Sequence, residues 1–137
     1  MIIPKDIRLR INKILGTEKW SLHLTADLRH TRMSIKTSGG AVVASANLSR
    51  FPGCCGIVVS YHALVDYLYR GRGLGTILNK LRISWAREQG YTVLMCTDRS
   101  DNEAQRAILK RNGWKDMFRF TNKRGGNQVA VSYIKLG

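Results

Sequence analysis

Acidic residues are scarce in this chain. Its 137 residues include 9 Asp and Glu against 23 Lys and Arg, which gives a formal net charge of +14 at pH 7. A positive field of this size attracts polyanions, so we expect nucleic acid, or a protein resting on it, as the partner. The alternative is a basic solubility surface, because net charge bears on association and not on fold.

Cysteines are few, and they do not suggest a disulfide framework. The chain has three, an odd number that includes the adjacent Cys54 and Cys55. We expect reduced thiols and a cytoplasmic location. Neighbouring side chains seldom converge on one ion, and no second pair completes a zinc site, so no metal is expected.

Long apolar runs are absent from the N-terminus. Charged residues interrupt it at Lys5, Asp6, Arg8 and Arg10, so we expect neither a signal peptide core nor a membrane span. Hydrophobic residues make up 44% of the chain, enough to bury a core without disulfides or metal. No linker or repeat breaks the chain, and we expect one domain over residues 1–137, as a monomer or a homodimer.

Hydrophobic periodicity predicts an α/β (α+β) fold. Helices are expected over 4–15, 76–89 and 102–112, and strands over 33–37, 41–47, 57–68, 92–96, 114–121 and 128–136. Residues 20–24 fit either a short strand or a substrate-side loop. The strand–helix–strand order between 57 and 96 implies a parallel pair, whereas the glycine-containing turns elsewhere imply antiparallel hairpins. A core-facing stripe is expected at Leu74, Ile77, Leu78, Leu81 and Trp85.

The most informative segment is the glycine- and arginine-rich run over residues 69–76, YRGRGLGT. The P-loop signature has no counterpart here, and the dinucleotide motif would put its last glycine at Thr76. Glycines let backbone N–H groups approach a phosphate, and the positive end of the following helix favours an anion. We predict a pyrophosphate cradle made by Arg70, Arg72, the amides of Gly73, Leu74, Gly75 and Thr76, and the Thr76 hydroxyl.

This run resembles the acyl-coenzyme A loop of the GNAT superfamily of N-acetyltransferases. Arg70, Gly73 and Gly75 match its signature Arg/Gln-x-x-Gly-x-Gly/Ala. Residues 102–114, from an asparagine to Gly-Trp, are similar to the family's Asn-to-Gly-aromatic segment, and the resemblance covers about residue 33 to the C-terminus. It implies a mixed, mostly antiparallel sheet with a splayed central parallel strand pair and flanking helices.

The resemblance also implies acetyl-coenzyme A as the cofactor. Pantetheine would be gripped at Val65 and Tyr67, and Asn102 belongs to the cofactor-binding set. The implied reaction is N-acyl transfer, in which an amine attacks the thioester and the thiolate leaves. A backbone N–H at or near Val65 would stabilise the oxyanion, which makes this residue part of the catalytic set as well.

The general base and acid are where the chain departs from that family. The positions where relatives often keep them hold Val59 and Leu109. The nearby substitutes for the base are Tyr61, His62 and Asp98. Histidine has the pKa suited to base work near neutrality, which favours His62. Asp98 can equally cap the loop that follows it.

Two functions follow from these observations. The first is an acetyl-coenzyme A-dependent N-acyltransferase whose acceptor amine lies on or near nucleic acid, including modification of a DNA base. The second is a catalytically weakened module of the same fold that binds nucleic acid or a protein partner, with Val59 and Leu109 as marks of lost catalysis. The first is favoured, because an unused loop would not need both arginines and both glycines. The acceptor stays unidentified.

Overall fold

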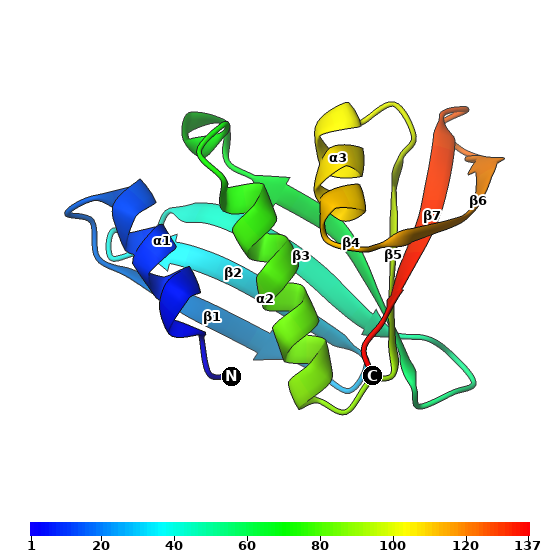
Figure 1. The fold of residues 1–137 in the computed structure, drawn as a ribbon, viewed down its shortest axis with the longest axis horizontal. Coiled ribbons are helices and arrows are strands. Elements are labelled where there is room, and N and C mark those ends of the chain that lie inside the picture. Colours follow the sequence, from blue (N-terminus) through cyan, green and yellow to red (C-terminus); the bar gives the residue numbers. More distant parts are fainter.

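The computed structural model describes all 137 residues as one seven-stranded sheet with three α-helices. Figure 1 shows the helices packed together against one face of the sheet. The elements, in chain order, are α1 Lys5–Leu15, β1 Trp20–Ala26, β2 His30–Thr37, β3 Val42–Arg50, β4 Ile57–Val65, a 3₁₀ turn Tyr67–Tyr69, α2 Leu74–Glu88, β5 Val93–Arg99, α3 Glu103–Arg111, β6 Lys115–Thr121 and β7 Gln128–Lys135.

The strand order is β1-β2-β3-β4-β5-β7-β6, and β4–β5 is the single parallel pair. All other neighbours are antiparallel. The predicted mixed sheet with a central parallel pair is therefore confirmed. The α2 helix makes the crossover between β4 and β5, as a parallel connection requires.

Several element boundaries differ from the sequence prediction, and β2, β3 and β5 each extend three residues further at one end than expected. Residues 20–26 form a full strand that pairs along its whole length with β2, which resolves the choice between strand and loop. The first central strand ends at Val65 rather than Leu68, because the Asp66 carboxylate accepts a hydrogen bond from the Leu68 amide at 3.0 Å and starts a 3₁₀ turn. The α2 helix begins two residues early, after Gly73. The boundaries were hard to predict because apolar residues occur both in the strands and in the turns that follow them.

The parallel pair splays apart partway along. Its last paired residues are Ser60 and Cys96, which we call the splay point. Beyond it β4 bulges against β3, since Tyr61 pairs with Asn47 but Leu64 pairs with Ser45. His62 lies in this bulge with φ of 50°, the only non-glycine residue with positive φ. The bulge turns β4 away from β5 and opens a wedge between the strands.

The core lies between the helices and one face of the sheet. The stripe predicted on α2 is confirmed, since all five of its residues are buried. Ile7, Ile11 and Leu15 of α1 complete the helix layer. Each such side chain contributes about 1.5–3 kcal/mol when fully buried. The opposite face of the sheet carries no helix, and no helix in the structure is both long and apolar enough to cross a membrane.

Candidate functional site

A cleft of about 560 Å³ lies beside the end of β4, past the splay point. One wall is the end of β4, the floor is the loop before α2, and the other wall is α3. The lining residues are Ala63, Leu64, Val65, Tyr69, Arg70, Gly71, Gly73, Leu74, Gly75, Thr76, Asn102, Ala104, Gln105, Ala107, Ile108 and Arg111. Seven of the residues predicted as cofactor-binding are thereby brought together: Val65, Arg70, Gly73, Leu74, Gly75, Thr76 and Asn102.

The N-terminus of α2 presents unpaired backbone amides to this cleft. The first amide that bonds within the helix is that of Ile77, to the Gly73 carbonyl at 3.2 Å, and the amides of Leu74, Gly75 and Thr76 make no hydrogen bond within the chain. No side chain caps this end, and Gly73 takes φ of 93°. Three free amides and a helix dipole in a cleft form an anion site.

The two glycines of the motif differ in what surrounds them. A Cβ at Gly73 would meet no atom within 4 Å, whereas a Cβ at Gly75 would lie 3.0 Å from Cδ1 of Ile108. Gly75 therefore lets α2 approach α3 closely, and Gly73 supplies the left-handed turn that aims the amides. The sequence interpretation treated both as making room for phosphate, and it contained no signal of the Ile108 contact.

The two arginines of the motif lie in different places. The Nε of Arg70 donates to the Val65 carbonyl at 3.0 Å, which ties the loop to the end of β4 and leaves its terminal nitrogens free. The Arg72 guanidinium lies over the Tyr69 ring, 5.7 Å from its centroid, and Arg72 is not in the lining. Tyr67 is also outside the lining and is 79% exposed. Arg72 and Tyr67 thus stay outside this lining, although Tyr67 lines a neighbouring hollow together with Val65 and Arg70.

The α3 wall adds residues that the sequence interpretation missed. Asn102 caps α3, its side-chain oxygen accepting from the Gln105 amide at 3.2 Å. Gln105, Ile108 and Arg111 follow on the same helix face and line the cleft. Their i, i+3, i+6 spacing from Gln105 was the available signal, because residues so spaced share a helix face. Arg111 places a further positive charge on the cleft, at the end of α3 away from its cap.

The candidate bases Tyr61 and His62 lie next to the splay point. Tyr61 is the first β4 residue after Ser60, and its ring meets the His62 ring edge-on at 5.1 Å. The Tyr61 hydroxyl and Nδ1 of His30, from β2, are hydrogen-bonded at 3.1 Å. His62 is exposed in the bulge. Two imidazoles and a phenol therefore gather beside the wedge, and the sequence carried no signal of the contact between His30 and Tyr61.

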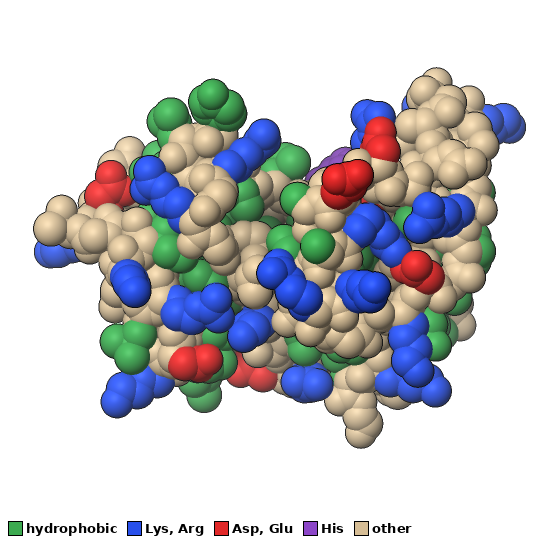
Figure 2. Space-filling model, turned by 45° about the horizontal axis from the view of Figure 1, so that its top comes forward, with side chains coloured by type: hydrophobic (Ala, Val, Ile, Leu, Met, Phe, Trp, Pro, Cys, Tyr) green, Lys and Arg blue, Asp and Glu red, His purple; other side chains and the backbone are tan.

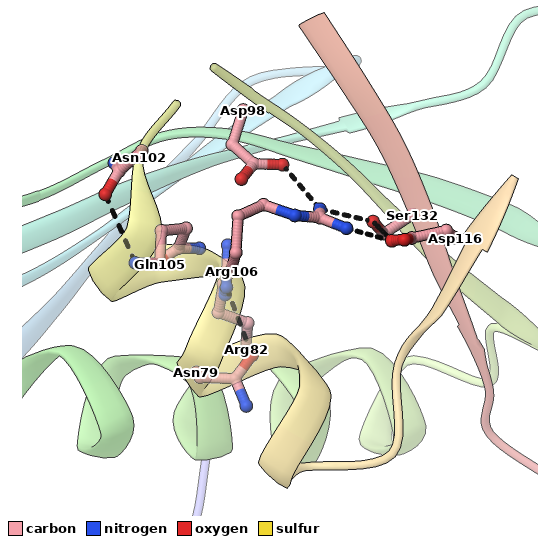
Figure 3. A network of polar contacts seen from close by, with 8 residues as sticks. All are labelled: Asn79, Arg82, Asp98, Asn102, Gln105, Arg106, Asp116 and Ser132. Atoms are coloured by element: carbon pink, nitrogen blue, oxygen red, sulfur yellow. Dashed lines mark hydrogen bonds and ion pairs between the residues drawn. The ribbon is translucent and has the colours of Figure 1, made fainter. Parts of the chain in front are cut away.

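Asp98, the third candidate base, is held in a separate network. Figure 3 shows Arg106 reaching from α3 to Asp98, Ser132 and Asp116, which come from three different strands. Asp98 accepts from Arg106 Nη1 at 3.2 Å, and its side chain is 8% exposed. Burial raises the pKa of the Asp98 carboxyl, and the Arg106 guanidinium offsets only part of that rise. None of the three candidate bases, Tyr61, His62 or Asp98, is among the residues that line the cleft.

Positive charge surrounds the cleft. Figure 2 shows Lys and Arg side chains spread over the face that carries the helices, with few acidic side chains among them. Arg70 and Arg111 line the cleft itself, and the lining includes no Asp or Glu. An anionic ligand would therefore meet a complementary potential here.

Comparisons with known proteins agree with this arrangement. A family model described as Acetyltransferase (GNAT) family matches residues 10–114. A similar solved structure is the ribosomal-protein-S18-alanine N-acetyltransferase from Escherichia coli, with a TM-score of 0.69 and 15% identity over 99% of this chain and 91% of that chain. No curated protein sequence is significantly similar to this chain.

Two further solved structures are alike in fold. Ard1 from Thermoplasma volcanium has a TM-score of 0.69 and 20% identity, over 77% of this chain and 70% of that chain. The IAA acetyltransferase from Bacillus cereus has a TM-score of 0.69 and 16% identity, over 79% of each chain. At such identities the likeness is one of fold, and acceptor specificity does not transfer with it.

Proposed function

Because the chain belongs to the GNAT acetyltransferase family, we propose that it is an N-acyltransferase that moves an acetyl group from acetyl-coenzyme A to an amine. The observation that carries the proposal is the cleft beside the splay point, floored by three unpaired amides at the start of α2. A pyrophosphate has the charge and the acceptor oxygens that such a floor requires. The residues present therefore fit the cofactor.

Each part of the cofactor has candidate partners in the chain. The amides of Gly73 to Thr76 and the free nitrogens of Arg70 would hold the pyrophosphate, and Arg72 would add charge from outside the lining. Val65, on the β4 wall, would contact pantetheine, with Tyr67 beyond the lining. Bound acetyl-coenzyme A would supply the activated acyl group. A backbone N–H at or near Val65 would donate to the oxygen on which negative charge develops.

His62 is the proposed general base for the acceptor amine. It is exposed beside the splay point, in a backbone conformation that costs about 1–3 kcal/mol for a non-glycine residue and that often marks a functional site. Tyr61 contacts it and is itself bonded to His30, so Tyr61 can orient His62 or pass on a proton. Asp98 is the weakest candidate, because its Oδ1 already accepts from Arg106 and its Oδ2 is buried.

The acceptor is proposed to lie on or near nucleic acid, and modification of a DNA base is one form of this. The support is the net charge of +14, most of which the cofactor does not require. The second candidate is a binding module that retains the cofactor loop without turnover. It is favoured by Val59 and Leu109, which leave no proton-transfer group at two positions.

Label transfer separates these two candidates. The protein is incubated with radiolabelled acetyl-coenzyme A and, separately, with spermidine, a peptide with a free α-amine, single-stranded DNA, duplex DNA and RNA. We expect label on at least one amine, and loss of that label when Gly73→Val removes the cradle. Confirmed cofactor binding with no label on any acceptor would support the binding module instead.

A further inference from the structure

The β6 strand is an exposed edge with aromatic side chains on it. It pairs with β7 only, and all seven of its residues are exposed. Phe118 is 56% exposed and Phe120 is 45% exposed, although large apolar side chains are usually buried. The core packing described above does not use them, and no part of the cofactor cleft touches them.

The two rings form a pair on the sheet face that carries no helix. Phe118 pairs with Val131 and Phe120 with Val129, and these valines pair in turn with Thr97 and Arg99 of β5. The ring centroids are 6.2 Å apart, close to the rise of about 6.8 Å over two strand residues, and the rings are tilted by 42°. We call Phe118 and Phe120 the aromatic edge. The two rings lie side by side, and a planar group such as a base can stack on each of them.

Basic residues flank the aromatic edge at both ends. Lys115 starts β6, and Lys123 and Arg124 lie in the turn after it. That turn is well ordered by hydrogen bonds: the Asn122 amide donates to the Asn127 carbonyl at 2.7 Å, and the Gly126 amide to the Asn122 carbonyl at 2.9 Å. The two cations are therefore presented on a fixed turn rather than on a loose loop.

Acidic groups near the aromatic edge are already paired. Asp116 is bonded to Arg106 and Ser132 toward the helix side. Asp101 is bonded through both oxygens to Arg99 at 3.1 Å. Lys123 and Arg124 have no ion pair. The unpaired charge at this edge of the sheet is thus positive.

We propose that the aromatic edge is a binding site for single-stranded nucleic acid, with bases stacked on Phe118 and Phe120 and phosphates held by Lys115, Lys123 and Arg124. Aromatic rings alternating with cations are the composition that such sites use, and stacking tolerates any base sequence. This proposal rests on the proposed function, because it names single-stranded nucleic acid as the class of acceptor for the acyltransferase. Figure 1 shows the β6–β7 turn on the same edge of the molecule as the starts of α2 and α3, so a strand held there would approach the wedge.

A second copy of the chain is the competing occupant of this edge. Edge strands with exposed apolar residues are prone to pair with each other. Here such pairing would bring two chains of charge +14 together along a basic strand, and repulsion of that kind keeps proteins monomeric. A polyanion would neutralise this positive charge, so we propose nucleic acid rather than a second copy as the occupant of the aromatic edge.

Fluorescence anisotropy with labelled oligonucleotides of about twelve nucleotides tests the proposal. Single-stranded DNA and RNA of one mixed sequence, and the corresponding DNA duplex, are titrated with the full chain. We expect single strands to bind more tightly than the duplex, and Phe118→Ala and Phe120→Ala each to weaken that binding about tenfold or more. Phe51→Ala, which removes a Phe that is 40% exposed on the β3–β4 loop, is the matched control and should change little.

The charges have their own readout. The double variant Lys123→Gln, Arg124→Gln should reduce the slope of log K against log salt by about 1.4, since each phosphate contact contributes about 0.7 for single strands. The matched control is Lys5→Gln, Lys13→Gln on α1, which makes the same change in net charge and should leave the slope nearly unchanged.

Three results would overturn the proposal. These are equal affinity for duplex and single strand, no effect of either phenylalanine variant, or a dimer by sedimentation that Phe118→Ala dissociates. Calorimetry with acetyl-coenzyme A on the same variants keeps the two proposals apart. If the phenylalanine variants bind both the cofactor and the oligonucleotides as the wild type does, only the aromatic-edge proposal is rejected. If the wild type does not bind acetyl-coenzyme A at all, the proposed function is rejected.

Discussion

Arg82 of α2 donates from Nη1 to the hydroxyl of Ser60 at 3.0 Å, and Ser60 is where the pairing of β4 with β5 ends. The arginine is 2% exposed, bonds Asn79 through its other terminal nitrogen, and lies over the Trp114 ring. Burial lowers its pKa, and no carboxylate is bonded to it. A buried cation thus joins the crossover helix to the splay point.

Ser60→Ala should destabilise the fold by about 1–3 kcal/mol, because it leaves a buried charged donor without its acceptor. Urea unfolding of wild type and variant gives the difference. Ser49→Ala on β3 is the control: Ser49 makes no side-chain hydrogen bond to the protein, and a change within about 0.5 kcal/mol is expected. Equal effects of the two substitutions would mean that the Arg82 contact contributes nothing measurable.

Asp116 should stabilise the fold in a pH-dependent way. Its hydrogen bond to Arg106 lowers the pKa of the Asp116 carboxyl below its ordinary 3.8. A carboxyl whose pKa falls on folding stabilises the native state above its unfolded pKa, and that contribution disappears as the pH drops through the folded pKa. Asp116→Asn should therefore cost up to about 1 kcal/mol at pH 7, a small value because the carboxyl is largely exposed, and less below about pH 4.

Asp98→Asn should show the opposite trend. Burial raises the pKa of Asp98, so folding takes up a proton there and the wild type gains stability relative to the variant as the pH falls. Urea unfolding at pH 7, at pH 5 and at about pH 3, below the ordinary carboxyl pKa, measures the two trends for both variants. Parallel trends for the two variants would contradict this account of the Arg106 network.

Thiol reactivity should divide the three cysteines. Cys96 is 1% exposed at the splay point, and burial raises its pKa to about 12. Cys55 is exposed and Cys54 is half-buried. Since the thiolate is the reactive form, a disulfide reagent such as DTNB should modify two thiols in the native protein and the third only after unfolding. The number of thiols modified in the native Cys96→Ser variant is the check. If that number is one lower than in the native wild type, Cys96 reacts in the folded protein, which would contradict the structure.

Replacing the proposed base should change the pH profile as well as the rate. His62→Ala should lower kcat by about 10²-fold or more and remove the inflection that an ionising general base gives to the pH profile of kcat. His23→Ala, another exposed histidine on the helix-free face, is the control. A loss below about tenfold with the inflection intact would instead mean that the amine arrives neutral and that positioning carries the rate.

The sequence predicted the parts of this molecule that depend on neighbours in the chain. The glycine turn before α2, the buried stripe on that helix and the crossover between the parallel strands all follow from local spacing, and the fold confirms them. The role of this turn as a pyrophosphate site stays a prediction. It did not predict contacts across long separations. His30 bonds Tyr61 across 31 positions, and Arg106 bonds Ser132 across 26. Such pairs depend on strand order and register, which no short pattern in one chain specifies.

The exposure of β6 was equally hidden. Its mixture of apolar and charged residues does not distinguish a half-buried strand from an exposed edge strand, and at the edge of the sheet all seven residues are exposed. The stacking of Arg72 on Tyr69 was hidden as well, because the motif position of this arginine carries no signal of that contact.

Calorimetric titration of acetyl-coenzyme A into wild type, Gly73→Val and Gly40→Val tests the central claim most directly. Gly73 and Gly40 have φ of 93° and 88° and open space around them, so valine strains both backbones to a similar degree, about 1–2 kcal/mol. Gly40 lies in the β2–β3 turn, outside the cleft. We predict binding to wild type and Gly40→Val, and none to a folded Gly73→Val. Equal affinity of all three proteins would contradict the claim that the start of α2 is the pyrophosphate site.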